Sequence, residues 1–167
     1  MTDPNKPLVA ILMGSQSDWE VMQEAVKQLT DLGIANEARV ISAHRATDAL
    51  MDYVAAAPNR GIEVFIAGAG MAAHLPGVIS AKTDLPVLGV PLKGGLLDGM
   101  DALMAIVQMP GGVPVAAFAV GKAGAKNAAL SAASILGLKY PAIKAAYQKL
   151  RAEQTAKAVA NTIPGAK

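Results

Sequence analysis

The sequence predicts an α/β fold in which a parallel sheet is covered by helices on both faces. Two observations lead to this prediction. Five short apolar segments are spread along the chain, and segments with apolar residues at helical spacing alternate with them. Each strand-and-helix unit takes about 25 to 30 residues, which suits a crossover between parallel strands. Such crossovers cover both faces of the sheet, so its strands are expected to be apolar throughout.

The predicted strands, in chain order, are residues 8–13, 37–41, 61–68, 85–91 and 113–121, and we expect the last two to be buried. The first helix follows GSQSD and the second follows SAHR. The third follows AGMAAHLPG, and two more are predicted near 98–108 and 123–136. The last helix starts at about 140. The first has Trp19, Met22, Val26 and Leu29 on one face, as an amphipathic helix requires.

Five strands with right-handed crossovers favour the flavodoxin-like order 2-1-3-4-5. Ligands of such sheets bind at the carboxyl ends of the strands, near the point where the order reverses between strands 1 and 3. We therefore examine the loops after strands 1, 2 and 3, which are residues 14–18, 42–45 and 68–77. Both histidines of the chain, His44 and His74, are expected at this rim.

The composition predicts one domain that associates with copies of itself. Residues 8–138 form the predicted domain, with an N-terminal tail at 1–7 and a C-terminal helix and tail at 139–167. The chain is 53% hydrophobic and only 4% aromatic, so its core must consist of small and aliphatic side chains. Apolar, Ala-rich segments at 99–110 and 127–138 are the expected contacts of a homo-oligomer.

Charge and cysteine content argue against several protein classes. The 15 Lys and Arg residues are scattered and the net charge is +2, which does not indicate a nucleic-acid surface. The chain has no cysteine, which excludes disulfides and thiol catalysis. Charged residues, Gly or Pro interrupt every apolar run before it reaches 18 residues, so we expect no membrane span, no export and a cytoplasmic location.

The GSQSD loop has the features of an anion site. Gly14 allows a tight turn, and Ser15 and Ser17 supply hydroxyls beside the free N–H groups of a helix start, which together suit a phosphate. Asp18 would repel a phosphate but suits the diol of a ribose. The alternative is that Ser or Asp caps the helix and no ligand is involved.

The other two loops carry the histidines. His44 can act as acid and base near neutral pH, and Arg45 can bind a phosphate through two hydrogen bonds. Alternatively, Ser42 or Thr47 caps the next helix and Arg45 is solvated. His74 lines the pocket or donates to a carbonyl. Two histidines also allow a metal, but no carboxylate pattern such as HExxH accompanies them, so we expect no metal.

Six blocks of sequence carry a resemblance to a known family. They are MGSQSDWEVM, VISAHR, AGAGMAAHLPG, LPVLGVP, DALMAIVQMPGGVPVA and GKAGAKNAAL. In this order and spacing, from about residue 8 to 136, the chain resembles the N5-carboxyaminoimidazole ribonucleotide mutases of de novo purine biosynthesis. The residues after about 140 show no such resemblance.

The resemblance implies roles for individual residues. His44 corresponds to the family's general acid and base, and the glycine-rich loop closes over the imidazole ring of the substrate. The implied substrate contacts are Ser15, Asp18 and Arg45, with Gly14, Ser17, Ser42, Ala43, Ala69, Gly70, His74 and Leu75 around them. The resemblance also implies a homo-octamer that binds a small ribonucleotide and uses no cofactor.

Several positions depart from the family pattern. Ala46 and Thr47 replace the usual Thr-Pro after SAHR, and alanines stand at 102 and 105 where serines are frequent. Met71 replaces a glycine in the closing loop and is expected to restrict that loop. The related branch that carboxylates the ribonucleotide directly with carbon dioxide lacks the AAHLPG form of this loop, so the mutase branch is favoured.

Two other functions fit parts of the sequence. A nucleotide-sensing module on the same fold would use GSQSD but would not need a titrating His44. A scaffold protein would explain the Ala-rich helices but not why both histidines are expected at one rim.

Overall fold

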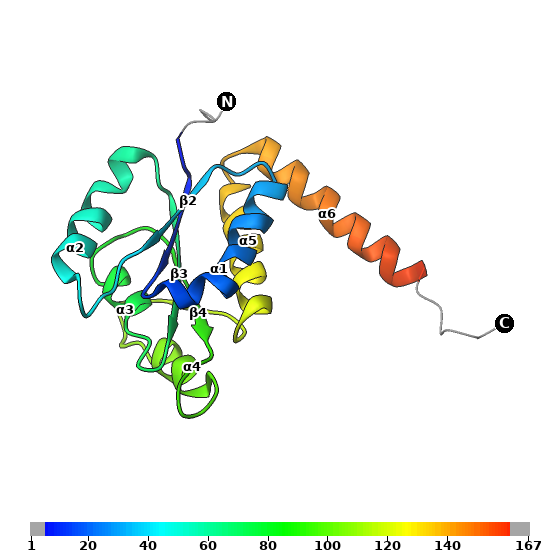
Figure 1. Ribbon diagram of the computed structural model, residues 1–167. Coiled ribbons are helices and arrows are strands. Elements are labelled where there is room, and N and C mark those ends of the chain that lie inside the picture. Colours follow the sequence, from blue (N-terminus) through cyan, green and yellow to red (C-terminus); the bar gives the residue numbers. More distant parts are fainter. Residues whose placement is uncertain (1–5, 161–167) are drawn as a thin grey trace.

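A computed structural model describes residues 6–160 of the chain (Figure 1). Residues 1–5 of the predicted N-terminal tail and residues 161–167 at the C-terminus lie outside the described part. One five-stranded parallel sheet, in the order β2-β1-β3-β4-β5, has helices on both faces. The predicted fold class and strand order are confirmed.

The strands are β1 (Val9–Met13), β2 (Asn36–Val40), β3 (Val64–Gly70), β4 (Val87–Leu92) and β5 (Ala116–Ala117). The α-helices are α1 (Trp19–Asp31), α2 (Thr47–Ala56), α3 (Leu75–Ser80), α4 (Met100–Val107), α5 (Lys122–Leu136) and α6 (Pro141–Ala160). Two short 3-10 helices, η1 (Gln16–Asp18) and η2 (Pro58–Arg60), complete the described elements. The register pairs Met13 with both Val40 and Gly68, so the carboxyl ends of the first three strands lie close together at one end of the sheet.

Two apolar layers enclose the sheet, because alternate side chains of a strand point to opposite faces. On β1, Ile11 and Met13 belong to the layer under α1 and α5, whereas Ala10 and Leu12 belong to the layer under α2, α3 and α4. Gly68 of β3 lets α1 approach the sheet closely, since a Cβ at this position would lie 2.4 Å from the sulfur of Met22. These close contacts hold the start of α1 over the carboxyl end of β1.

Two strands are less buried than the sequence predicts. The predicted buried strand at 113–121 contains only a two-residue strand, Ala116–Ala117, whose residues are exposed or half-buried. It is an edge strand that follows Gly112 and Pro114, and a proline cannot donate to a sheet ladder. Phe118 and Gly121 still donate backbone hydrogen bonds to β4. β2 at the opposite edge also has no fully buried residue.

The Ala-rich helix α5 corrects one expectation about assembly. Its alanines at 125, 128, 129, 132 and 133 are fully buried against the sheet and α1, so this face of the helix is not available to a second copy. Small side chains here allow close packing within the chain. By contrast, the segment 99–110 does expose apolar residues, including Met100, Met104 and Val107.

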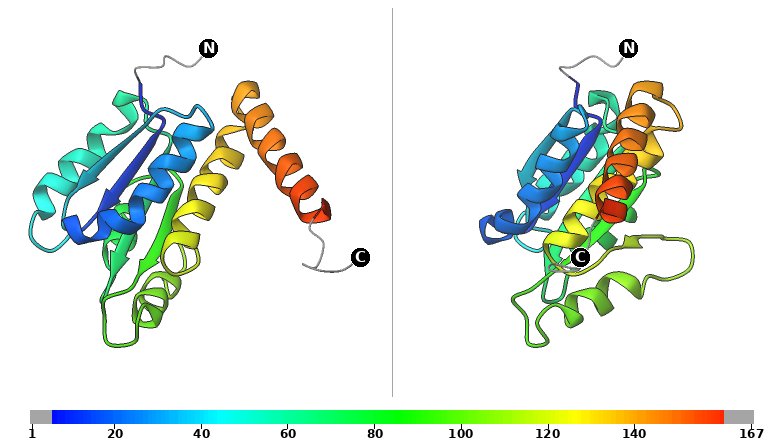
Figure 2. Two further views of the ribbon diagram at one scale, coloured as in Figure 1. Left: turned by 45° about the vertical axis from the view of Figure 1, so that its right-hand side comes forward. Right: turned by 90° about the vertical axis from the view of Figure 1, so that its right-hand side faces the viewer.

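Helix α6 extends away from the rest of the chain (Figure 2). Ile143 is its one buried residue, and the last turns are exposed on every side. Its base is attached to the sheet through Glu63, which accepts hydrogen bonds from Lys139 Nζ at 2.6 Å and from the Tyr140 hydroxyl. Within residues 6–160, no helix is long and apolar enough to span a bilayer.

Candidate active site

The loops that follow β1, β2, β3 and β4 enclose a cavity of about 460 Å³ at the carboxyl edge of the sheet. Every residue that the sequence singled out for the site lines this cavity. They are Gly14, Ser15, Ser17, Asp18, Ser42, Ala43, His44, Arg45, Ala69, Gly70, His74 and Leu75. The strand order thus brings three separate loops to one place.

The GSQSD loop combines a helix cap with a cavity wall. Ser15 Oγ accepts a hydrogen bond from the Ser17 N–H at 3.3 Å, and the Asp18 carboxylate accepts one from the Ser15 N–H at 3.0 Å. Ser15 and Asp18 therefore cap the short helix η1, whereas Asp18 makes no side-chain cap to α1, and the same side chains line the cavity. Burial raises the pKa of Asp18, while hydrogen bonds from the backbone of Ser15 and Gly14 and from Ser17 oppose that rise.

Arg45 links the second loop to the first. Its Nη2 donates to the carbonyl of Gly14 at 3.2 Å, and its Nε donates to Ser42 Oγ at 3.4 Å. The guanidinium is therefore held beside the GSQSD loop by hydrogen bonds, although Arg45 remains exposed to solvent. This places a permanent positive charge next to the two serine hydroxyls, as a phosphate site requires.

The prediction that Ser42 or Thr47 caps the following helix is wrong. The residue before α2 is Ala46, which makes no side-chain cap. Thr47 is itself the first helical residue, and its hydroxyl donates to the carbonyl of Ala43 at 2.7 Å. Ser42 lies a turn too early, and its hydroxyl instead accepts the N–H of Arg45.

The two histidines are in direct contact across the cavity. His44 Nε2 lies 2.7 Å from His74 Nδ1, and the two rings are nearly perpendicular at 82°. One nitrogen must donate and the other accept, so the two rings form a hydrogen bond whose direction depends on their tautomers. His74 thus bonds to His44 and not to a carbonyl. Among residues 6–160, no third His, Cys, Asp or Glu joins them in a cluster that could hold a metal.

The loop that carries His74 has an unusual backbone. Met71 has φ +56° and Ala73 has φ +46°, a left-handed conformation that costs free energy for residues with a Cβ. Met71 is 65% exposed at the mouth of the cavity. The loop between β3 and α3 thus combines two strained residues, of which Met71 is exposed and Ala73 is buried.

Sequence reasoning missed Lys93 and Gly94, which also line the cavity. They directly follow β4, so they reach the same edge of the sheet as the three loops that we examined. The strand order is the feature that could have identified them, because β4 lies next to β3. A larger groove of about 940 Å³ lies near the amino end of β4, beside Lys82 and Pro114, and contains none of the candidate residues.

Comparison with known proteins assigns the chain to a family. A family model described as AIR carboxylase matches residues 8–157. The chain belongs to the AIR carboxylase family. The match starts where the predicted domain starts and extends beyond residue 138 to residue 157 in α6, so it is longer than the resemblance that ends at about residue 136.

Individual members of the AIR carboxylase family agree with the resemblance seen in the sequence. A protein of Pseudomonas aeruginosa named N5-carboxyaminoimidazole ribonucleotide mutase is 54% identical over 157 residues, which cover 94% of this chain and 96% of the relative. One of Saccharolobus solfataricus with the same name is 59% identical over 134 residues, or 80% and 84% of the two chains. The crystal structure of Treponema denticola PurE superposes with a TM-score of 0.81 at 26% identity, over 92% and 94% of the chains.

Proposed function

We propose that this chain is an isomerase of de novo purine biosynthesis that converts N5-carboxyaminoimidazole ribonucleotide to 4-carboxy-5-aminoimidazole ribonucleotide. The contact between His44 and His74, in a cavity that also holds Ser15, Asp18 and Arg45, is the observation that carries this proposal. A nucleotide-sensing module would need the serines and the arginine but no hydrogen-bonded pair of histidines. The names of the relatives support the same reaction.

The cavity offers separate places for the parts of the substrate. Ser15, Ser17, Ser42 and Arg45 lie together and bind the phosphate, because hydroxyls and a guanidinium supply several donors to one anion. Asp18 accepts from the ribose hydroxyls. The imidazole ring then extends toward the histidine pair and Gly70, where the lack of a side chain allows a flat ring to approach the backbone.

His44 handles the proton in both halves of the reaction. It first protonates the exocyclic nitrogen that carries the carboxylate, and the bond between that nitrogen and carbon breaks to release carbon dioxide. The electron-rich C4 of the ring attacks the carbon dioxide, and the neutral His44 removes the C4 proton, which restores the aromatic ring. One proton is supplied and one recovered, so the residue returns to its starting state. The ring provides the electrons, and enclosure keeps the carbon dioxide close to C4.

The proposal includes a homo-octamer in the cytoplasm, as the resemblance implies. The exposed apolar residues of α4 and of the loop before it support assembly, since a monomer would leave them in water.

An isotope experiment tests the proposed reaction. The protein is given unlabelled N5-carboxyaminoimidazole ribonucleotide in buffer that contains labelled bicarbonate, and label in the product is measured from the earliest time points. A mutase should return its own carbon dioxide to C4 and give mostly unlabelled product. Fully labelled product at once would instead show a direct carboxylase. Because the substrate also breaks down unaided, a reaction without protein runs in parallel.

Two variants make this experiment specific to the site. His44→Asn should keep the fold and ligand binding but lower turnover by at least ~100-fold, the scale of a lost general acid-base. Activity within a few-fold of the unmodified protein would contradict the role of His44. Met71→Gly removes the strained side chain from the loop at the cavity mouth and should lower any label that enters from solution.

A further inference from the structure

Lys93 is a cation of the cavity that the mechanism above does not use. Apart from the two histidines, the charged residues of the cavity lining are Asp18, Arg45 and Lys93. The backbone position of Lys93 is well defined, because Leu92 pairs with Gly70 in the sheet. The carbonyl oxygen of Lys93 would lie 3.4 Å from a Cβ at Gly70, so the two chain segments lie side by side. Lys93 therefore flanks the loop that carries Met71 and His74.

The strand order separates the two cations. Arg45 follows β2 and Lys93 follows β4, and two strands lie between them in the sheet. Neighbouring strands are about 4.8 Å apart, so the two backbones are roughly 14 Å apart across the cavity rim. Arg45 is tied to the GSQSD loop at one end. Lys93 is at the other end, beyond the histidine pair.

We propose that Lys93 binds the carboxylate that migrates during the reaction, while Arg45 holds the phosphate at the opposite end. This inference rests on the proposed function, whose substrate carries a phosphate at one end and a carboxylate at the other. A cation at each end of the site matches a ligand with an anion at each end. The flexible ammonium of a lysine suits a carboxylate that moves between N5 and C4, because it can follow the group without a fixed two-point geometry.

Asp98 is a competitor for the ammonium of Lys93. Lys93 Nζ lies 2.6 Å from Asp98 Oδ2, and the two side chains are 64% and 72% exposed. Exposed ion pairs of this kind are weak, so Lys93 can exchange Asp98 for a ligand carboxylate at little cost. Asp98 also has φ +50°, a left-handed conformation that Asn adopts as readily as Asp. Asp98→Asn is therefore a substitution that removes the competing charge and keeps the backbone.

Two ligands that differ only by the carboxylate test the inference. Calorimetry measures Kd for 4-carboxy-5-aminoimidazole ribonucleotide and for 5-aminoimidazole ribonucleotide, with the full chain and with Lys93→Gln. The variant should bind the carboxylated ligand about 10-fold more weakly, as expected when one hydrogen bond to a charged group is lost. It should bind the uncarboxylated ligand with unchanged Kd. Arg45→Lys is the matched control, and it should raise Kd for both ligands.

Other outcomes overturn the inference in distinct ways. If Lys93→Gln raises Kd for both ligands equally, Lys93 binds a part that they share. If it changes Kd for neither ligand, Lys93 does not contact the ligand. Asp98→Asn should bind the carboxylated ligand at least as tightly as the unmodified protein, and weaker binding would contradict the competition. If the unmodified protein binds neither ribonucleotide, the proposed function itself is wrong.

Discussion

At the scale of a single residue, ionised Asp18 is expected to lower the stability of the free protein and to strengthen ribonucleotide binding. Burial raises the pKa of its carboxyl above the ordinary value, so ionising Asp18 costs more free energy in the folded protein than in the unfolded chain. The stabilising effect of that proton is complete below the ordinary pKa and is lost as pH rises through the raised pKa. At pH 7 the ionised Asp18 therefore destabilises the free protein, and Asp18→Asn should raise Tm by up to about 3 °C. The same change should weaken ribonucleotide binding by about 10-fold, because a charged acceptor is lost. Thermal scans at pH 7 and pH 4 with calorimetry check this; a lower Tm at pH 7 would contradict it.

At the scale of elements, Tyr53 attaches α2 to the edge strand β2. Its hydroxyl donates to Glu37 at 2.5 Å, and Arg60 pairs with the same carboxylate at 2.6 Å. Burial, and then the hydrogen bond to Glu37, raise the pKa of Tyr53 to about 12. The contribution of this tyrosine to stability is thus complete below its ordinary pKa near 10 and is lost as pH rises toward 12. Tyr53→Phe should lower the free energy of unfolding by about 1 kcal/mol at pH 8, and the difference should shrink between pH 10 and 12. Urea unfolding at several pH values measures it, and a difference independent of pH would refute the explanation.

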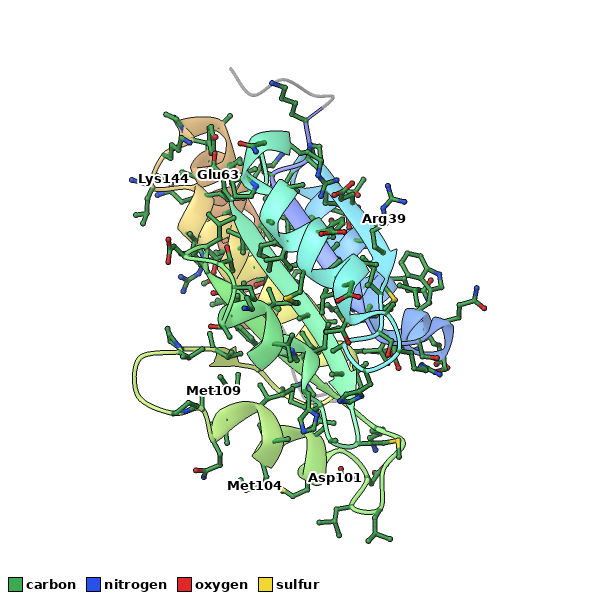
Figure 3. All side chains as sticks on the ribbon, turned by 90° about the vertical axis from the view of Figure 1, so that its left-hand side faces the viewer. Arg39, Glu63, Asp101, Met104, Met109 and Lys144 are labelled. Carbon is green, nitrogen blue, oxygen red and sulfur yellow. The ribbon has the colours of Figure 1, made fainter. Side chains whose placement is uncertain are left out.

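At the scale of the molecule, the exposed apolar face of α4 predicts assembly. Leu96, Leu97, Met100, Met104 and Val107 are 47–97% exposed along α4 and the loop before it. Figure 3 shows Met104 at the opposite end of the molecule from Glu63 and Lys144. Light scattering should give a mass of about eight chains, the closed assembly that the resemblance implies. Met104→Glu should lower that mass, whereas Asn59→Glu, which adds the same charge to an exposed position near Glu63 in sequence, should not. A monomer at micromolar concentration would contradict the assembly.

The sequence alone was sufficient for the fold and for the position of the site. Hydrophobic periodicity is a local property, so strands and helices were predicted near their observed bounds, as with residues 8–13 for Val9–Met13. Parallel topology then brought the loops after three strands to one edge, and all twelve predicted site residues line one cavity. The roles of these residues in the reaction stay predictions.

Tertiary structure decided the features that depend on contacts between distant segments. Residues 113–121 are apolar enough for a buried strand, yet the edge of the sheet offers neighbours on one side only and β5 shortens to Ala116–Ala117. From the sequence, the alanines of α5 were expected to contact a partner chain, but in the fold they are buried against α1 and the sheet. His44 and His74 are 30 residues apart in the chain, and no periodicity specifies a contact of 2.7 Å between their rings. The ion pair between Lys93 and Asp98 likewise depends on how the loop after β4 folds back, which no sequence pattern specifies.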